Sequence, residues 1–325
     1  MKDNKNRNIV GKKILFVSYN FYNYNIEIKN KLIELGAEVD MYEQVKYTLW
    51  YTLLLRLHLG SNYKKHLANT ILKAAMKKKY DYVLVLEIHQ TDAFFKTLRE
   101  LQSEACFVLY YWDSIRYFDY RPFMKYFDRT YSFDIDDTQK YPDIHYQPLF
   151  FIDTYAKVRD KITKVCNYDM LQVASFQIER YNKMKRFLSD YNIDPRRVRI
   201  YYRATLGQYI LLKLKRYDMN WIGVKKLSHK DIANLYSQTK CILDFNKQKQ
   251  SGLSMRTLEC MGAGKKLITS NQHVKKEPIY NSTNIFVIGD DDVAGLNAFI
   301  EKDFEYTEII ENYSIRNFCL NLFQV

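Results

Sequence analysis

Short apolar runs alternate with helix-spaced segments along the first half of the chain. Residues 12–20 form an apolar run of strand length, residues 24–36 have helical spacing, and residues 37–43 alternate between apolar and polar side chains. Similar strand-length runs follow at residues 80–87, 105–113 and 129–134, and the segment 91–102 between two of them is helical in spacing. Strands of this kind, separated by helices, predict a parallel sheet covered on both faces. We therefore expect a Rossmann-like domain, although the GxGxxG turn of dinucleotide-binding proteins is missing.

A second series of the same kind begins after residues 148–153. Its candidate strands are residues 170–176, 197–203, 220–224, 241–245, 266–270 and 285–289, and its candidate helices are about residues 178–192, 207–217, 228–240 and 254–263. A chain of 325 residues with 47% hydrophobic content is long enough to bury two cores. The sequence thus predicts an α/β protein of two Rossmann-like domains, residues 1–153 and 154–304, facing across a cleft. Residues 305–323 are expected to form one long amphipathic helix, so that the segment 305–325 packs back toward the first domain.

Several features favour a cytoplasmic protein. The five cysteines include no CxxC pair, and the basic start lacks the apolar core of a signal peptide. No run approaches the roughly 20 apolar residues of a membrane-spanning helix. Residues 47–60 are apolar and rich in Tyr and Trp, which fits a buried helix or a segment lying on the inner face of the membrane.

Positive charge is concentrated in one part of the chain. The net charge is +13, and residues 157–230 alone carry 18 Lys and Arg against 6 Asp and Glu. Such a region favours a phosphate-bearing partner, namely a nucleotide, a nucleic acid or an anionic membrane surface. A solvated basic face without a partner fits the same count.

The segment "SGLSMRTLECMGAGKKLITSN", residues 251–271, follows a predicted strand. Ser254 can cap a helix that runs to about Gly262, so the helix N-terminus lies at the carboxyl end of the strand, where N–H groups favour a phosphate. Arg256 in the first turn opposes the helix dipole unless an anion meets it or its side chain turns into solvent. Glu259 flanks the apolar stripe of this helix, and a carboxylate there needs a partner: ribose hydroxyls or a neighbouring cation.

Parts of the chain resemble a known family. "SMRTLECMGAGKKLITSN" followed by "IYNSTNIFVIG" is similar to the donor-binding segment of GT-B glycosyltransferases, especially bacterial enzymes of capsule, exopolysaccharide and lipopolysaccharide assembly and their CgeB-like relatives. "YDYVLVLE", "LYYWDSIRYF" and "YQPLFFID" resemble the N-terminal domain of such proteins. The resemblance implies a nucleotide-sugar donor, a saccharide or lipid-linked acceptor, and no cofactor or bound metal. Peripheral contact with an anionic membrane fits such an acceptor.

The resemblance also implies roles for individual residues. Glu259 matches the glutamate that contacts the donor ribose. Arg256, Thr257 and Gly252, with the Ser254-capped helix N-terminus, fall where the diphosphate approaches. Basic residues for the donor phosphates match Arg180 and Lys183.

One position departs from the pattern of the family. Retaining enzymes with a Glu-x7-Glu motif carry a second glutamate eight positions earlier, where this chain has Ser251. The retaining mechanism is therefore not implied, and inversion stays open.

An inverting reaction needs a base toward the acceptor hydroxyl. Asp113 ends a predicted strand and is a candidate, although an aspartate there could equally cap a turn. Glu87, followed by His89, stands at an equivalent strand end with the same alternative. Trp112 is expected to be core. The acidic stretch 134–137 is read as a solvated turn, not a metal site.

Two other classes of function stay open. A polyol-phosphate transferase or a sugar epimerase would use the same nucleotide site with different chemistry. A nucleic-acid-binding protein would explain the basic region without catalysis, but the sequence holds no recognised nucleic-acid motif. We therefore expect no nucleic-acid partner.

Overall fold

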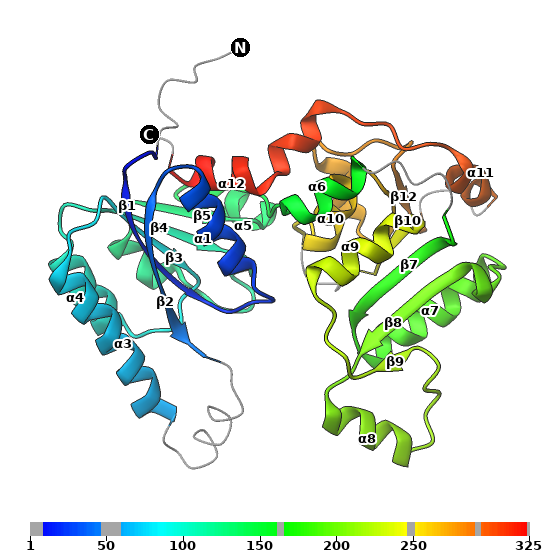
Figure 1. Ribbon diagram of the computed structural model, residues 1–325, viewed down its shortest axis with the longest axis horizontal. Coiled ribbons are helices and arrows are strands. Elements are labelled where there is room, and N and C mark those ends of the chain that lie inside the picture. Colours follow the sequence, from blue (N-terminus) through cyan, green and yellow to red (C-terminus); the bar gives the residue numbers. More distant parts are fainter. Residues whose placement is uncertain (1–8, 47–59, 161–165, 246–250, 290–293, 324–325) are drawn as a thin grey trace. The chain divides into compact units, whose positions relative to one another are not determined.

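The structure is a computed structural model that describes residues 9–46, 60–160, 166–245, 251–289 and 294–323. The chain divides into two compact units, drawn in Figure 1. Unit 1 comprises residues 1–149 and 315–325, and unit 2 comprises residues 150–314. The prediction for residues 47–60 lies, apart from Gly60, outside the described residues.

Unit 1 contains a parallel six-stranded sheet in the order β2-β1-β3-β4-β5-β6. Its strands are β1 (Lys13–Tyr19), β2 (Glu38–Val45), β3 (Tyr82–Leu86), β4 (Cys106–Tyr111), β5 (Arg129–Ser132) and β6 (His145–Tyr146). Its helices are α1 (Tyr24–Glu34), α3 (Gly60–Lys77), α4 (Asp92–Leu101), the 3-10 helix η1 (Arg121–Tyr126), α5 (Ile135–Lys140) and α12 (Ile315–Leu322). Helices α3 and α4 pack on the sheet face that carries Leu15 and Leu109. On the opposite face, Phe318 of α12 meets the ring of Tyr110 at 4.8 Å between centroids.

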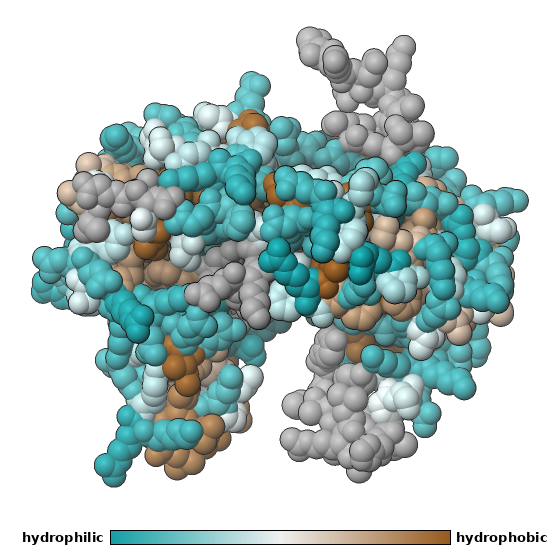
Figure 2. Space-filling view, turned by 180° about the vertical axis from the view of Figure 1, so that it is seen from behind, coloured by the Kyte–Doolittle hydropathy of each residue, from teal (hydrophilic) through white to brown (hydrophobic). Residues whose placement is uncertain are grey.

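Unit 2 contains a second parallel six-stranded sheet, in the order β12-β11-β10-β7-β8-β9. Its strands are β7 (Tyr168–Ser175), β8 (Val198–Arg203), β9 (Ile222–Gly223), β10 (Thr239–Asp244), β11 (Lys266–Thr269) and β12 (Ile285–Val287). Its helices are α6 (Asp153–Arg159), α7 (Ile178–Asp190), α8 (Leu206–Leu214), α9 (His229–Ser237), α10 (Met255–Gly262) and α11 (Gly295–Glu301), with the 3-10 helices η2 (Pro195–Arg197), η3 (Gln272–Lys276) and η4 (Glu308–Tyr313). Helix α8 buries only Leu212, and its surface is apolar in Figure 2.

These two sheets confirm the predicted α/β fold class. In each sheet the strand order reverses once, because the chain builds outward in one direction and then returns to build in the other. The reversal falls between β1 and β3 in unit 1 and between β7 and β10 in unit 2. In parallel α/β sheets, ligands bind beyond the carboxyl ends of the strands at this switch point. The topology therefore marks one candidate location in each unit.

The prediction of one long helix over residues 305–323 is wrong. The 3-10 helix η4 ends at Tyr313, Ser314 is extended, and α12 begins at Ile315. Phe151 forms an isolated bridge with Ser314, and its amide donates to the Tyr313 carbonyl at 2.9 Å. That carbonyl is thus satisfied by a distant amide, and the helical ladder stops there.

The acidic stretch 134–137 is not a solvated turn, so that prediction is also wrong. Asp134 is fully buried and caps α5, accepting from the amides of Asp136 and Asp137. Asp137 is buried as well, and it accepts from the amide of Ile115 at 2.8 Å. Burial raises the pKa of the Asp137 carboxyl. These aspartates fix the loop after β4, because Asp137 binds the backbone just beyond Asp113.

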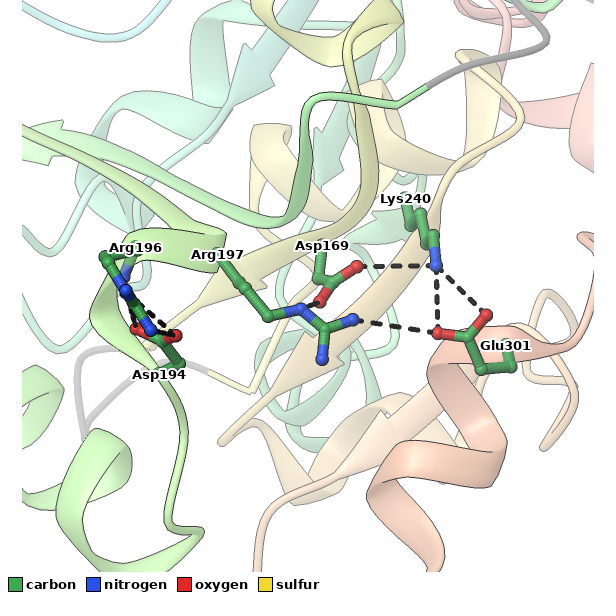
Figure 3. Close-up of polar contacts among 6 residues, drawn as sticks. All are labelled: Asp169, Asp194, Arg196, Arg197, Lys240 and Glu301. Carbon is green, nitrogen blue, oxygen red and sulfur yellow. Dashed lines mark hydrogen bonds and ion pairs between the residues drawn. The ribbon is translucent and has the colours of Figure 1, made fainter.

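Four charged side chains meet at the amino edge of the unit 2 sheet, where β7, β8 and β10 begin (Figure 3). Lys240 lies 2.9 Å from Glu301 and 3.4 Å from Asp169, and Arg197 pairs with both carboxylates. Beside them, Arg196 pairs with Asp194 at 2.7 Å. This edge is opposite to the carboxyl ends of the strands. Part of the predicted basic region is therefore neutralised by structural ion pairs.

A glycine in α10 permits close packing of the segment before α6. A β-carbon added to Gly262 would lie 2.3 Å from Cγ of Phe151, whose ring is buried. We expect Gly262→Ala to lower the free energy of unfolding by roughly 1–3 kcal/mol, because the ring must shift in a packed core. Thermal melting checks this. Gly295→Ala is the control, since a β-carbon there meets no atom of the described residues within 4 Å, and equal melting temperatures for the two variants would contradict the expectation.

Candidate functional site

At the switch point of unit 2, Asp244 ends β10 and is buried. Its carboxylate accepts hydrogen bonds from the hydroxyls of Ser254 (2.5 Å) and Thr257 (3.3 Å) and from Nη1 of Arg256 (2.6 Å). Asp244 therefore ties the end of the strand to the first turn of α10.

Helix α10 begins where the sequence predicts. The hydroxyl of Ser254 accepts from the amide of Thr257 at 3.1 Å, which is the expected N-cap. The next strand is tied to the same place, because the Thr269 hydroxyl and the Ser270 amide donate to the Asp244 carbonyl at 3.0 and 3.2 Å. Asp244 thus joins the end of β10 to the start of α10 and to the end of β11.

Arg256 pairs within the protein. A cation in the first turn of a helix opposes the helix dipole unless an anion lies nearby. Asp244 of this chain is that anion for Arg256, so the position of Arg256 does not by itself require a bound phosphate. Burial opposes its charge, but Asp244, Tyr236 and Glu259 together raise the pKa of the Arg256 guanidinium above its usual value. Its side chain is 22% exposed, so it is not sealed from solvent.

Glu259 is buried on the next turn of α10. Burial first, and the Glu259 carboxylate second, raise the pKa of the Tyr236 phenol on α9. Because Glu259 also acts on Arg256, the carboxylate lies close to both side chains. The ring centroids of Tyr236 and Tyr155 lie 5.4 Å apart. The Tyr155 hydroxyl is 3.2 Å from Nδ1 of His229. Helices α6, α9 and α10 thus share one buried polar layer around Glu259.

Arg180 stands at the other side of the same switch point, at the start of α7. Its Nη1 donates to the carbonyl of Ser175, the last residue of β7, at 2.8 Å. Burial raises the pKa of Tyr202 in β8, and the positive charges of Arg180 and then Arg256 oppose that rise. Both guanidinium groups therefore lie near one phenol. Lys183 pairs with Glu179 at 2.9 Å along α7.

Gly252 and Ser251 are buried in the loop that precedes α10. The carbonyl of Gly252 accepts from Nδ2 of Asn271 at 3.4 Å. This bond fixes the loop against the end of β11. The structure thus gathers Gly252, Ser254, Arg256 and Thr257 at the end of β10.

At the switch point of unit 1, Glu87 directly follows β3 with a φ of 57°, a region that non-glycine residues rarely adopt. Gln44 of β2 holds this turn. Its Nε2 donates to the carbonyls of Leu86 (3.1 Å) and Glu87 (3.0 Å), and its Oε1 accepts from the amide of His89 (3.2 Å). The backbone strain is therefore held in place by a buried side chain.

The Glu87 carboxylate lies near the aromatic rings of Tyr19, His89 and Trp112. Its Oε2 is 3.4 Å from Nε2 of His89, and its buried Oε1 has no hydrogen-bond partner among the described residues. The indole of Trp112, which is buried as expected, donates to the Tyr19 hydroxyl at 2.8 Å. Burial, then Glu87 and more weakly Asp113, raise the pKa of Tyr19. Glu87 and Asp113 thus act on the same phenol, from the ends of two neighbouring strands.

Asp244, Tyr19 and Gln44 are not among the residues that the sequence predicts for either site. Asp244 and Tyr19 each end an apolar run, and a charged or phenolic side chain in that position was a usable signal. Gln44 carries no such signal, because its role depends on the neighbouring turn.

The described residues hold neither a candidate metal centre nor a candidate membrane-spanning helix. No group of three or more His, Cys, Asp or Glu in this part of the chain could hold a metal ion. No helix in the described ranges is long and apolar enough to cross a membrane.

Comparison with known proteins gives a likeness in structure only. No protein-family model matches the chain, and no curated protein matches its sequence. An alpha-glucosyltransferase, solved with UDP and a 13-mer DNA containing a central A:G mismatch, is similar with a TM-score of 0.58 and 13% identity, over 96% of this chain and 95% of that one. The UDP-GlcNAc 2-epimerase from Neisseria meningitidis, bound to UDP-GlcNAc, has a TM-score of 0.51 and 12% identity over 94% and 97%. The lipopolysaccharide outer core galactosyltransferase WaaB, in its apo form, has a TM-score of 0.50 and 13% identity over 96% and 98%. The chain has the GT-B fold of these structures.

Proposed function

We propose that this protein transfers a sugar from a nucleotide-sugar donor to a saccharide or lipid-linked acceptor in the synthesis of a bacterial surface polysaccharide. The observation that carries the proposal is the arrangement at the switch point of unit 2. Two guanidinium groups, Arg180 and Arg256, lie near Tyr202, and the buried carboxylate of Glu259 stands one turn along α10 from Arg256. The GT-B fold and the family resemblance of this segment support the proposal.

In this proposal the guanidinium groups bind the diphosphate of the donor. Arg256 is held by Asp244, so its geometry is set before the ligand arrives, and its exposed part meets the phosphate oxygens. Glu259 accepts hydrogen bonds from the ribose hydroxyls. During transfer, the bond between the sugar C1 and the diphosphate oxygen breaks, and the electron pair leaves with the diphosphate. The positive charge of Arg180 and Arg256 stabilises that leaving group, and the proposal needs no metal there.

The acceptor hydroxyl must lose a proton as its oxygen bonds to C1. We assign this task, for an inverting reaction, to Glu87, because its buried Oε1 has no partner among the described residues and can accept a proton. Tyr19 and His89 position the carboxylate, because the two rings contact each other and Nε2 of His89 lies 3.4 Å from Oε2 of Glu87. Asp113 is the second candidate for the base.

Nucleotide binding tests the donor site. A thermal-shift screen with UDP, GDP, CMP and ADP is expected to raise the melting temperature with at least one nucleotide, since a ligand at about 100 times its Kd stabilises by about 2.7 kcal/mol. In Glu259→Gln we expect the affinity to fall about 10- to 100-fold, because a charged hydrogen-bond acceptor is lost. Glu308→Gln, an exposed acid of the same unit, is the matched control and should bind as the wild type does.

Two outcomes count against the donor site. If no nucleotide stabilises the protein, the proposed function fails. If a nucleotide stabilises wild type and Glu259→Gln equally, the nucleotide binds at another place.

A sugar epimerase is the second candidate, favoured by the likeness to the UDP-GlcNAc 2-epimerase. The two reactions differ in their need for an acceptor. An epimerase interconverts nucleotide sugars without one, whereas a transferase releases nucleoside diphosphate at an appreciable rate only when an acceptor is present. Incubation of the stabilising nucleotide sugar with and without acceptor separates them.

A further inference from the structure

Helix α8 carries an apolar surface that the rest of unit 2 does not cover. A capping box fixes its start, because the Thr205 hydroxyl accepts from the Gln208 amide and the Gln208 side chain accepts from the Thr205 amide. Leu206, Ile210 and Leu214, four residues apart, form one stripe with exposures of 67%, 51% and 76%. The apolar surface over α8, at the lower left of Figure 2, includes this stripe. Soluble proteins seldom leave leucines side by side in water without a partner.

The chain around and after this stripe is basic. Residues 203–230 contain seven Lys and Arg and a single acid, Asp218, which pairs with Lys185 of α7 at 2.9 Å. Six of these basic residues are exposed: Lys213, Lys215, Arg216, Lys225, Lys226 and Lys230. Arg196 and Arg197 pair with acids at the amino edge of the sheet, whereas residues 203–230 keep an excess of six positive charges.

The combination of leucines and cations selects among possible partners. A nucleic acid would meet the cations, but it binds through phosphates and stacked bases and offers little to a leucine stripe. A second copy of this chain, joined symmetrically through α8, would bring two groups of like charges together. An anionic bilayer surface matches both features, since its acyl boundary accepts the leucines and its headgroups accept the cations.

We propose that α8 docks this protein on an anionic phospholipid surface. Leu206, Ile210 and Leu214 enter the boundary between headgroups and acyl chains, and Lys213 and Lys215 face the headgroup phosphates. With nine residues the helix is about 14 Å long, which suits shallow insertion parallel to the surface. This docking goes beyond glycosyl transfer, and its test does not depend on that activity.

Vesicle co-sedimentation of the full chain tests the proposal. We expect binding to vesicles of phosphatidylcholine with about one third phosphatidylglycerol, and at least about tenfold weaker binding to phosphatidylcholine alone. Leu206→Gln with Leu214→Gln should reduce binding to the anionic vesicles about tenfold, because the inserted apolar surface is lost. Lys213→Gln with Lys215→Gln should reduce it as well and flatten its dependence on salt between about 0.1 and 0.5 M.

Matched variants on unit 1 serve as controls. Ile33→Gln with Met76→Gln removes two exposed apolar side chains, and Lys73→Gln with Lys96→Gln removes two exposed cations. Both controls should bind vesicles as the wild type does. All replaced side chains are exposed, so unchanged melting temperatures establish that each variant is folded, and Leu214→Gln alone provides a milder variant.

Three outcomes would overturn the proposal. The wild type does not bind anionic vesicles, or the α8 variants bind as well as the wild type does, so that another segment makes the contact. In the third outcome, light scattering shows a dimer that the α8 variants abolish while vesicle binding is absent, which would assign the surface to a second copy.

Discussion

Asp244→Ala is expected to lower the free energy of unfolding by about 2–4 kcal/mol. The substitution removes the acceptor of three side chains at once: Ser254, Arg256 and Thr257. Arg256 is left without the carboxylate that balances its charge, and the turn between β10 and α10 loses its anchor. Since the Arg256 side chain is 22% exposed and can reach water, we place the effect below that of a fully buried pair.

Thermal and urea unfolding measure this effect. For a unit of this size, each kcal/mol corresponds to roughly 2–4 °C in melting temperature. Asp190→Ala removes an exposed acid of the same unit and should stay within about 0.5 kcal/mol of the wild type. If Asp244→Ala melts like Asp190→Ala, the carboxylate is not the anchor that its contacts indicate.

A second substitution of the same residue tests the donor site. If Asp244 sets the geometry of Arg256, then nucleotide affinity should also fall in Asp244→Asn, which keeps the size of the side chain but loses its charge. The negative charge is removed at the same time, which by itself would favour a bound phosphate. A fall in affinity therefore means that the positioning of Arg256 by Asp244 outweighs the repulsion between Asp244 and the phosphate. A rise would mean that Asp244 competes with the ligand for Arg256.

Glu87→Gln is expected to lower kcat about 100- to 10,000-fold, the range for the loss of a general base. The amide keeps the shape of the carboxylate but cannot take a proton from the acceptor. KM for the donor should change little, because the residues proposed to bind the donor, Arg180, Arg256 and Glu259, lie on helices of unit 2. The fold should be retained, since the bonds of Gln44 to this turn go to the backbone of Leu86 and Glu87 and not to the replaced atoms.

Steady-state kinetics with the nucleotide sugar identified by the thermal-shift screen measure this change. Glu100→Gln, an exposed acid of α4, is the matched control and should keep the activity of the wild type. Asp113→Asn decides between the two candidate bases. If Asp113→Asn abolishes transfer while Glu87→Gln keeps it within a few-fold, then Asp113 is the base and the assignment of Glu87 is wrong.

Local patterns predicted most of the fold. The strand-length runs and helical spacings correspond to strands and helices in both units, with bounds that differ by a few residues. They were predictable because the burial of one face of an element imposes a period on the sequence itself. The Ser254 cap was also predictable, because its side chain binds an amide only three residues ahead in the chain. Short elements escaped prediction: β6 has two residues and α6 has seven, too few for a period to be recognised.

The candidate site was predictable only in part. The sequence placed four candidate residues at the start of one helix, because they are neighbours along the chain: Ser254, Arg256, Thr257 and Glu259. It could not show that Asp244 holds three of them, since that contact requires the end of β10 to meet the start of α10. Arg256 does meet an anion, as its position in the first turn of a helix requires, but the sequence did not show that Asp244 supplies it.

By itself, the sequence determined the type of each long element and their division into two series, because apolar period and capping act over a few residues. The tertiary structure alone decided the pairings between distant residues. The order β2-β1-β3-β4 brings Tyr19, Glu87 and Trp112 together, and the bridge from Phe151 to Ser314 stops the final helix that its amphipathic pattern favours. Pairings of this kind depend on which strand lies beside which, and many strand orders are compatible with the same local pattern.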